Sequence, residues 1–398
     1  MNILSSLKSG HWPSLAGAWL HLTVSFMVWL LIGAVAIPLA QNLLLTEQQR
    51  AWLLALPLLG GAGLRILAGW SADWVGARST AIAILFIEFG ALIWGWLAVE
   101  GFHEALAFAV CLGVAGSSFA VSLPLAGRAY PPEARGLVLG VAASGNVGTV
   151  LILFFAPRWA AAMNWHFVCG VMAAVVAVTL MLFLWLVPQT TRSVREDVAW
   201  WHHVARLIRR RAAYWLCFMY GITFGGFVGL CTLLPLLLHE VYELSAVTAG
   251  ALAALCGLAG SIARPFGGHA ADRQGGLQML RYVLPVVAGA VVAVLSSTLP
   301  MAVGMMIITT GALGFGNGVV FQLVAEWFPA EIGLASGLVG AAGGFGGFVL
   351  SMAAATLEGL TGSYEIGLWL FAGAVMCAWG TVMIALRAQA GSVADLSP

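Results

Sequence analysis

The sequence predicts an all-α membrane protein with twelve transmembrane helices. Hydrophobic residues make up 61% of the 398 residues and charged residues only 8%, whereas an ordinary soluble domain is about 25% charged. Apolar stretches of about 20 residues, the length that crosses a hydrocarbon core about 30 Å thick, recur from end to end. A β-barrel would instead alternate apolar and polar residues over ten-residue segments, so the spans are predicted to be helices.

The first span is predicted to be retained in the mature protein. It is too long for a signal-peptide core and is not followed by a convincing cleavage site. The twelve spans are expected near residues 17–40, 51–72, 79–99, 105–127, 136–157, 166–187, 213–238, 247–270, 278–298, 301–325, 333–356 and 365–387.

Basic residues predict the orientation, because short cytoplasmic loops carry an excess of Lys and Arg. Arg50 and Arg158 fall on one side of the predicted spans, and Arg65 and Arg264 fall within spans. The remaining basic residues share the other side: Lys8, Arg78, Arg128, Arg135, Arg192, Arg195, Arg206, Arg209, Arg210, Arg211, Arg273, Arg281 and Arg387. We therefore expect a multi-pass protein of the inner (plasma) membrane with both termini in the cytoplasm, in contact with membrane lipid.

One long polar stretch divides the chain into two halves. Residues 1–188 would form an N-terminal six-helix bundle, residues 189–212 a cytoplasmic linker, and residues 213–398 a C-terminal six-helix bundle. The halves align at an offset of 198 or 199 residues, and such internal repeats are typical of transporter folds. Three further matches share this register: residues 113–116 with 311–314, 130–133 with 328–331, and 145–148 with 343–346.

Two arginines occupy equivalent places in the two halves. Arg65 and Arg264 each lie in an apolar segment, and each is followed eight residues later by an aspartate, Asp73 or Asp272. An arginine inside a membrane span costs about 2.5–3.5 kcal/mol on insertion scales, so it indicates a functional site unless it forms a structural ion pair. The repeated placement favours a shared anion site.

The segment after the second predicted span contains a charged, glycine-containing motif that the second half repeats in part. It has the spacing G-x-x-x-D-x-x-G-x-R, and the second half repeats its opening. The motif residues are Gly69, Asp73, Gly76 and Arg78, with Gly268, Asp272 and Arg273 in the second half. This motif resembles the loop motif of the major facilitator superfamily. The resemblance implies two six-helix halves that rock about a central site. We expect the loop charges to stabilise one conformation and not to contact substrate.

Glycine runs in the fifth and eleventh spans carry a closer resemblance. Residues 140–148 and 340–347 look like the paired nitrate signatures of the nitrate/nitrite porter family, which also has one arginine in the second span and one in the eighth. The resemblance covers essentially the full length. Close helix packing is the structural explanation for most of these glycines, since small residues let helices approach in lipid.

The resemblance implies the roles of individual residues. Arg65 and Arg264 would grip the anion from the two halves, Asn146 would donate its amide, and the glycine backbone would approach a very small ligand. The implied substrate-binding residues are Arg65, Arg264, Asn146, Tyr220, Phe119, Phe26, Gly145, Gly343 and Gly344. A planar oxyanion suits guanidinium forks, which keep their charge in a protein. The expected activity is transport of nitrate, nitrite or both, in the direction of nitrate uptake.

Other modes of transport and other substrates stay open. The protein could instead exchange nitrate for nitrite, export nitrite, or carry another small anion such as a carboxylate. Glu88 is the carboxylate placed deepest in a span and is a candidate for proton coupling or for a structural contact.

The sequence predicts a transporter and not an enzyme. The phosphate-binding loop of an ATPase is missing, and no set of catalytic or metal-ligating residues converges. We therefore expect no cofactor and no metal. The net charge of +1 argues against nucleic-acid binding, and a monomer is expected.

Overall fold

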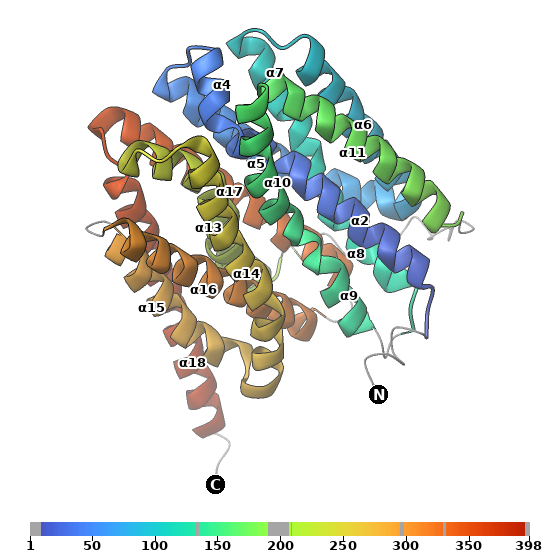
Figure 1. Cartoon of the computed structure of the whole chain (residues 1–398). Helices are drawn as coiled ribbons and strands as arrows, with labels where there is room; N and C mark the ends of the chain where they lie inside the picture. The colour runs from blue at the N-terminus through green and yellow to red at the C-terminus, as the bar shows by residue number, and fades with distance from the viewer. Residues whose placement is uncertain are drawn as a thin grey trace.

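The computed structural model describes residues 9–131, 135–189, 207, 209–294, 298–328 and 332–394. Several sequence features lie outside the described residues: most of the linker at 189–212, the repeat segments at 132–133 and 329–331, and the basic residues Lys8, Arg192, Arg195 and Arg206. The part of the chain that is described is helical, with no strand (Figure 1).

The chain begins with an interrupted helical run, α2 (Trp12–Trp29), α3 (Leu31–Ala34) and α4 (Ala36–Asn42). The His11 side chain caps α2 by accepting a hydrogen bond from the Ser14 amide. Leu30 and Val35, with ψ of 7° and 16°, interrupt the run. Near-zero ψ values depart from the helical value of about −42°, which explains why one predicted span is three short helices.

The predicted loop between the second and third spans is instead largely helical. α5 (Glu47–Ser71) passes into a π-helical segment, η1 (Ala72–Gly76), and then into α6 (Ala77–Leu97). Gly76 has φ of +107°, a backbone conformation that residues with a side chain rarely adopt. The motif glycine therefore separates α5 from α6 without an extended loop.

The remaining helices follow the predicted order. They are α7 (Phe102–Gly113), η2 (Val114–Ser118), α8 (Phe119–Arg128), α9 (Arg135–Ala143), η4 (Ser144–Asn146), α10 (Val147–Ala162), α11 (Trp165–Leu186), α13 (Arg211–Tyr242), α14 (Ala246–Gln274), α15 (Gly276–Val294), α16 (Leu299–Trp327), α17 (Ile332–Thr361) and α18 (Glu365–Ala394). The two short segments η2 and η4 are 3₁₀ turns that interrupt long helical runs. Such turns inside helices are common at functional positions.

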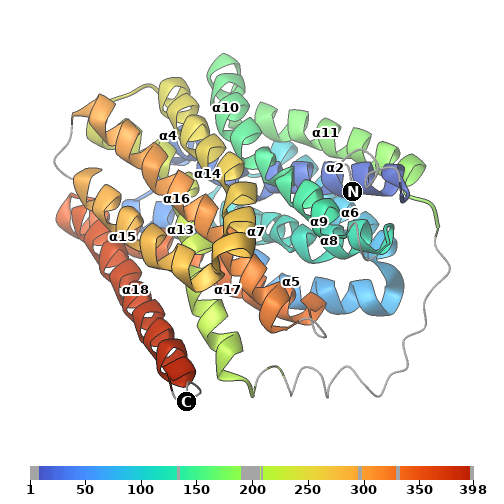
Figure 2. The ribbon, with the colours of Figure 1, turned by 90° about the horizontal axis from the view of Figure 1, so that it is seen from below.

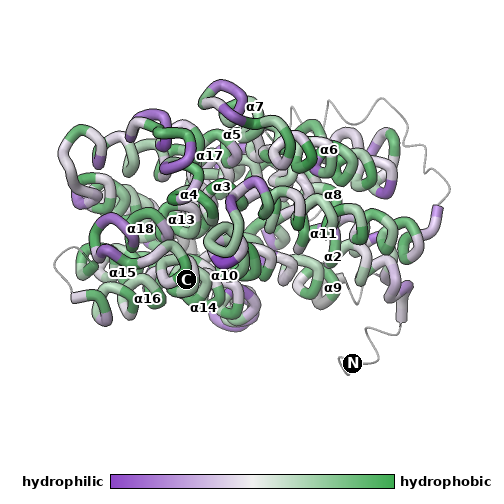
Figure 3. The backbone as a smooth tube through the Cα atoms, turned by 45° about the horizontal axis from the view of Figure 1, so that its top comes forward, coloured by the Kyte–Doolittle hydropathy of each residue, from purple (hydrophilic) through white to green (hydrophobic). Residues whose placement is uncertain are grey.

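Ten helical segments of the described residues are long and apolar enough to cross a membrane. One of the ten, Glu47–Leu97, is 51 residues long and includes both α5 and α6. α2 falls outside the ten, since His21, two serines, Pro13 and three tryptophans lower its hydropathy. Figure 3 shows the apolar character of the helices, with polar residues gathered at many of the turns.

Helices from distant parts of the sequence pack side by side. α5 packs against α17, α10 packs against α14, and α13 packs against α17. Figure 2 shows α17 between α13 and α5. Glycines permit the closest approaches: a Cβ on Gly344 would lie 3.1 Å from the Ala62 Cβ, and one on Gly314 would lie 2.0 Å from the Gly260 carbonyl oxygen. Small residues at these crossings agree with how helices associate in lipid.

Candidate anion-binding site

Arg65 is buried inside the helix bundle and oriented by backbone carbonyls. Its side chain on α5 is only 1% exposed. Nε donates to the Gly116 carbonyl at 2.8 Å, and Nη1 donates to the Gly340 carbonyl. Gly116 belongs to η2 and Gly340 to α17. Two segments that lie more than 200 residues apart in the sequence therefore orient one guanidinium. Its Nη2 has no hydrogen-bond partner among the described residues.

Arg264 lies in the corresponding place on α14 and is also buried, at 8% exposure. Its Nη2 donates to the Tyr220 hydroxyl at 3.3 Å, and its Nη1 has no partner. Buried polar groups in proteins nearly always find a hydrogen-bond partner. An unsatisfied N–H on each arginine therefore gives the site donors that an anion could accept from.

Two phenylalanines lie against both guanidinium groups. The Phe119 ring centroid is 5.4 Å from the Arg65 Cζ and 5.5 Å from the Arg264 Cζ. The Phe224 centroid is 5.3 Å and 6.0 Å from the same two atoms. Rings within about 6 Å attract a cation through their quadrupole. The two arginines therefore face one shared aromatic environment.

Tyr220 forms part of the same environment. Its ring stacks on Phe224 with centroids 4.9 Å apart and an interplanar angle of 2°. A Cβ on Gly343 would lie 2.6 Å from the Tyr220 ring, so the glycine makes room for the tyrosine. The predicted residues Arg65, Arg264, Phe119, Tyr220 and Gly343 thus come together.

Among the residues that the structure describes, neither central arginine has a carboxylate partner. The ion pairs among the described residues are Arg50 with Glu240 and Arg128 with Asp73. Two buried guanidinium groups near one another repel, and aromatic faces offset only part of the cost of burying charge. The site therefore carries a net positive charge that a small anion would neutralise.

Among the described residues, no hydrogen bond or cation–π contact joins Phe26 or Asn146 to the guanidinium groups. Phe26 is buried and packs edge-on against Trp29 at 5.3 Å, and Trp29 in turn contacts Arg65, with the Arg65 Cζ 5.2 Å from its ring centroid. Asn146 is buried with an unpartnered Oδ1, and no hydrogen bond joins it to Arg65 or Arg264.

Two glycines of the predicted site serve helix packing. A Cβ on Gly145 would meet Leu22 at 3.0 Å, and one on Gly344 would meet Ala62 at 3.1 Å. Both glycines thus lie at crossings with helices of the first half of the chain, Gly145 against α2 and Gly344 against α5. The atoms nearest to a Cβ at these two positions belong to Leu22 and Ala62, and none of them belongs to a central arginine.

Sequence reasoning missed several residues of this site. Trp29, Phe224 and Phe321 pack around the arginines, and Phe321 lies 5.5 Å from the Arg264 Cζ. Aromatic residues are common in spans, so their presence alone carries no signal. Phe224 follows Tyr220 by one helical turn, and that i, i+4 spacing could have identified it.

The loop motif lies away from the arginines. Arg128 Nη2 donates to Asp73 Oδ1 at 2.6 Å, and Arg78 Nε donates to the Val187 carbonyl at 2.7 Å. A Cβ on Gly69 would find Ala120 only at 3.9 Å, and one on Gly268 would find the Gly318 carbonyl at 3.7 Å. Asp272 and Arg273 are exposed. The first copy of the motif is therefore tied to α8, whereas the charges of the second face outward.

Two comparisons with known sequences cover most of the chain. A family model described as Major Facilitator Superfamily matches residues 18–351. The probable nitrate/nitrite transporter NarK2 of Mycobacterium tuberculosis (strain H37Rv) is 33% identical over 367 residues, 89% of this chain and 91% of the relative. The nitrite extrusion protein of Bacillus subtilis (strain 168) is 29% identical over 354 residues, 87% and 88% of the two chains.

A solved structure shares the fold at low sequence identity. It is a bacterial homologue of the human lysosomal transporter Spinster in an inward-facing and occupied conformation. The TM-score is 0.71 with 17% identity, and the match covers 94% of this chain and 96% of the other. At that identity the similarity concerns the fold alone.

Proposed function

This chain belongs to the nitrate/nitrite porter family of the major facilitator superfamily, and we propose on that premise that it moves nitrate and nitrite across the membrane as a secondary transporter. The observation that carries the proposal is the pair of buried arginines, Arg65 and Arg264, which share Phe119 and Phe224 and have no carboxylate partner in the described part of the chain. A positive, aromatic-walled site suits a small oxyanion and not a cation.

The anion would bind between the two guanidinium groups. The free N–H groups on Arg65 Nη2 and Arg264 Nη1 would donate to its oxygens. The Tyr220 hydroxyl, which already accepts from Arg264, would turn toward the bound anion as a donor. Phe119 and Phe224 would cover its faces and exclude water. Asn146 would add its amide once the helices shift, which agrees with its burial.

Transport would proceed by alternating access between two six-helix halves. We assign twelve spans by taking α2–α4 as one, α5 and α6 as two, α7–α8 and α9–α10 as one each, and α11 and α13–α18 as the remaining seven. Residues 1–188 and 213–398 would form the halves, joined by the linker at 189–212. Phe26, Gly145 and Gly344 would serve at the crossings between helices as the halves rock.

The two ends of the bundle would act as gates. Arg50 at the start of α5 bonds to Glu240 at the end of α13, and Glu240 also accepts a hydrogen bond from the Tyr364 hydroxyl at 2.5 Å. Burial and the neighbouring Glu240 carboxylate both raise the pKa of Tyr364, so it stays a donor. These contacts join the two proposed halves, and we expect the transporter to be closed at this end. Basic residues at the opposite end favour the cytoplasmic side there.

Transport in reconstituted vesicles tests the proposal. Proteoliposomes loaded with nitrite and placed in external nitrate should exchange the two anions, and vesicles loaded with sulfate should not. Uptake of nitrate without internal nitrite would favour net import, whereas strict dependence on internal nitrite would favour exchange. The proposed nitrate/nitrite activity is wrong if purified, folded protein transports neither anion in either arrangement. If formate competes with labelled nitrate for transport as well as unlabelled nitrate does, a carboxylate is the better candidate substrate.

A further inference from the structure

A second group of buried polar side chains lies inside the first part of the bundle, apart from the arginines. Glu88 on α6, His21 and Ser25 on α2, and Ser122 on α8 are each 0% exposed. α6 packs against both α2 and α8, so these four residues come from three neighbouring helices. A polar group fully buried in an apolar bundle is costly unless it is satisfied, and this cluster therefore needs an explanation.

Glu88 has no charge partner in the described part of the chain. Neither carboxyl oxygen completes a hydrogen bond, although the Ser25 hydroxyl is the polar group that faces it. The ion pairs of the described residues involve other carboxylates. A bare carboxylate there would be an uncompensated buried charge, which proteins avoid by binding a proton.

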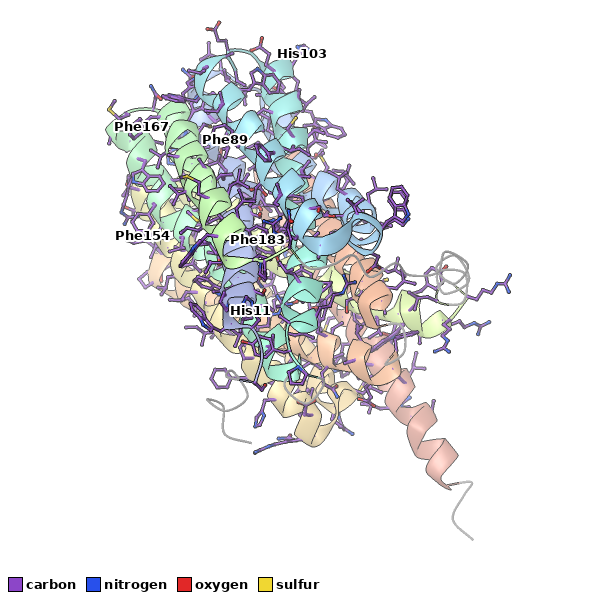
Figure 4. All side chains as sticks on the ribbon, turned by 90° about the vertical axis from the view of Figure 1, so that its right-hand side faces the viewer. His11, Phe89, His103, Phe154, Phe167 and Phe183 are labelled. Atoms are coloured by element: carbon purple, nitrogen blue, oxygen red, sulfur yellow. The ribbon has the colours of Figure 1, made fainter. Side chains whose placement is uncertain are left out.

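His21 provides a second proton-binding group on α2, one turn before Ser25. Its Nδ1 lies 2.7 Å from the Ser122 Oγ, and its Nε2 has no partner. Phe183 on α11, labelled in Figure 4, covers the ring with centroids 5.6 Å apart. His21 and Ser25 are one helical turn apart, a rise of about 6 Å. His21 faces Ala81 on α6, two turns before Glu88, so the polar groups follow one line between α2 and α6.

Among the described residues, no hydrogen bond or ion pair joins Glu88 to the other titratable groups on helices around α6. Those on α5, η1, α7, α8 and α11 are Glu47, Arg50, Arg65, Asp73, His103, Glu104, Cys111, Arg128, His166 and Cys169, and Arg78 belongs to α6 itself. Arg65 donates to Gly116 and Gly340. His166 Nδ1 is engaged with the Gly95 carbonyl. His21 is therefore the titratable group placed along the same line as Glu88.

We propose that Glu88, Ser25 and His21 form a proton-binding site that couples proton entry to anion transport. The inference rests on the proposed transport of nitrate and nitrite. One proton would bind the Glu88 carboxylate from the open side of the membrane, giving a neutral carboxylic acid whose O–H donates to the Ser25 Oγ. On the other side the O–H bond breaks, and the proton leaves to the His21 Nε2 and then to water.

Helix α2 connects this site with the anion site. Ser25 precedes Phe26, which packs against Trp29, and Trp29 lies against Arg65. Protonation of Glu88 removes a charge and therefore lowers the free energy of burying α6 against α2. Helix α2 also carries Trp29, which forms part of the aromatic wall of the anion site. A proton carried with each nitrate would make the transported pair electrically neutral, and Glu88 would lose its proton on the far side before the empty transporter returns.

Nitrate accumulation under a pH gradient tests this site. Full-length protein in proteoliposomes, with the membrane potential clamped to zero, should accumulate nitrate several-fold more when the outside is acidic. Glu88→Gln should lose that response and keep nitrate/nitrite exchange, because glutamine cannot carry the proton. Glu100→Gln, which changes an exposed glutamate, is the matched control and should behave as the wild type.

The outcomes separate this inference from the proposed function. If the wild type exchanges nitrate and nitrite but ignores the pH gradient, the proton site is wrong and the transport proposal stands. If Glu88→Gln keeps the gradient response, the site is also wrong. If neither protein transports either anion in any mode, the proposed function itself fails.

If Glu88→Gln does not fold, infrared spectroscopy of the folded wild type still tests whether Glu88 carries a proton. Folded wild type should show the C=O band of a buried carboxylic acid, which Glu88→Asp should shift and which added nitrate should perturb. Ser25→Ala should move the same band by removing the hydroxyl that accepts from the acid. A wild-type spectrum without such a band, or a band that ignores both substitutions, would overturn the assignment.

Discussion

The two arginines at the centre of this molecule differ from Arg50 and Arg128 near its ends in their burial and in having no carboxylate partner among the described residues. Arg50 pairs with Glu240 and Arg128 pairs with Asp73, and all four side chains keep some exposure. Arg65 and Arg264 are buried at 1% and 8% exposure, and they contact carbonyls, a hydroxyl and aromatic rings instead.

Arg50 and Arg128 thus form structural ion pairs, whereas the charges of Arg65 and Arg264 remain available to bind a ligand. A partly exposed ion pair contributes little stability, about 0.2–1 kcal/mol. A buried arginine without a carboxylate costs stability unless something else compensates. An incoming anion would compensate both central arginines together, so their unpaired state is what the proposed function requires.

The largest effect is expected from replacing the central arginines with lysine. Arg65→Lys would retain the charge but lose the fork that reaches Gly116 and Gly340, and Arg264→Lys would lose the planar donor pair. Each lost charge-assisted hydrogen bond is worth about 1.5–3 kcal/mol, so transport should fall by about 100-fold or more. Uptake is measured beside thermal stability, with Arg128→Lys as the control. Near-normal uptake by either central variant would remove that arginine from the site.

A smaller but still large effect is expected at the glycine crossings. Leucine at Gly344 would push against Ala62, where even a Cβ would lie at 3.1 Å, and leucine at Gly145 would push against Leu22. Overpacking typically costs about 1–3 kcal/mol, and here it should slow exchange by about tenfold or more. Gly90→Leu is the matched control, since a Cβ there meets nothing within 4 Å. If all three variants exchange at the same rate, the crossings do not limit the transport cycle.

Asn146 should affect affinity more than rate. Asn146→Ala would remove the amide proposed to reach the anion and would weaken nitrate binding by about 1.5–3 kcal/mol, the worth of a hydrogen bond to a charged group. Helix packing at Gly145 would be preserved, so the maximal exchange rate should change little. Nitrate affinity and maximal rate are measured separately. Unchanged affinity would exclude Asn146 from the site.

Removing the ion pair between Arg50 and Glu240 should have a modest effect on the equilibrium between the closed and open conformations at this end of the bundle. Glu240→Gln would remove the charge that holds Arg50 and would leave only a neutral acceptor for Tyr364. An exposed or partly exposed pair is worth about 0.2–1 kcal/mol, so the open population at this end should rise by a factor of about 1.4 to 5. Accessibility of a cysteine at Leu45 to a polar thiol reagent measures the opening. A decrease in labelling would contradict the gate assignment.

The sequence predicted the arginines better than their surroundings, for a physical reason. A charge in an apolar span is visible in the sequence because burial makes it costly, so Arg65 and Arg264 could be found by inspection. The partners that orient Arg65 are backbone carbonyls of Gly116 and Gly340. Every residue has a carbonyl, and only the packing of η2 and α17 decides which ones face the guanidinium.

The course of the backbone was predicted less well where local geometry decides it. The first span was expected as one helix, but it is interrupted at Leu30 and Val35. The motif at residues 69–78 was expected as a loop, but it runs from the end of α5 through the π-helical segment Ala72–Gly76 into α6. Hydrophobic periodicity indicates how long a span is and which of its residues are buried. It does not predict where a single turn of the helix changes its hydrogen-bond spacing.

The most direct test of the central claim is the stabilisation of the purified protein by nitrate. A ligand that binds the folded state adds about 2.7 kcal/mol at 100 times its Kd. Nitrate should therefore raise the Tm of the wild type in a dose-dependent way, while sulfate at the same concentration should not. Arg65→Lys and Arg264→Lys should lose most of the nitrate-specific shift, and Arg128→Lys should keep it. Equal nitrate shifts in all four proteins, or an equal shift with sulfate, would contradict an anion site built on the two unpaired arginines.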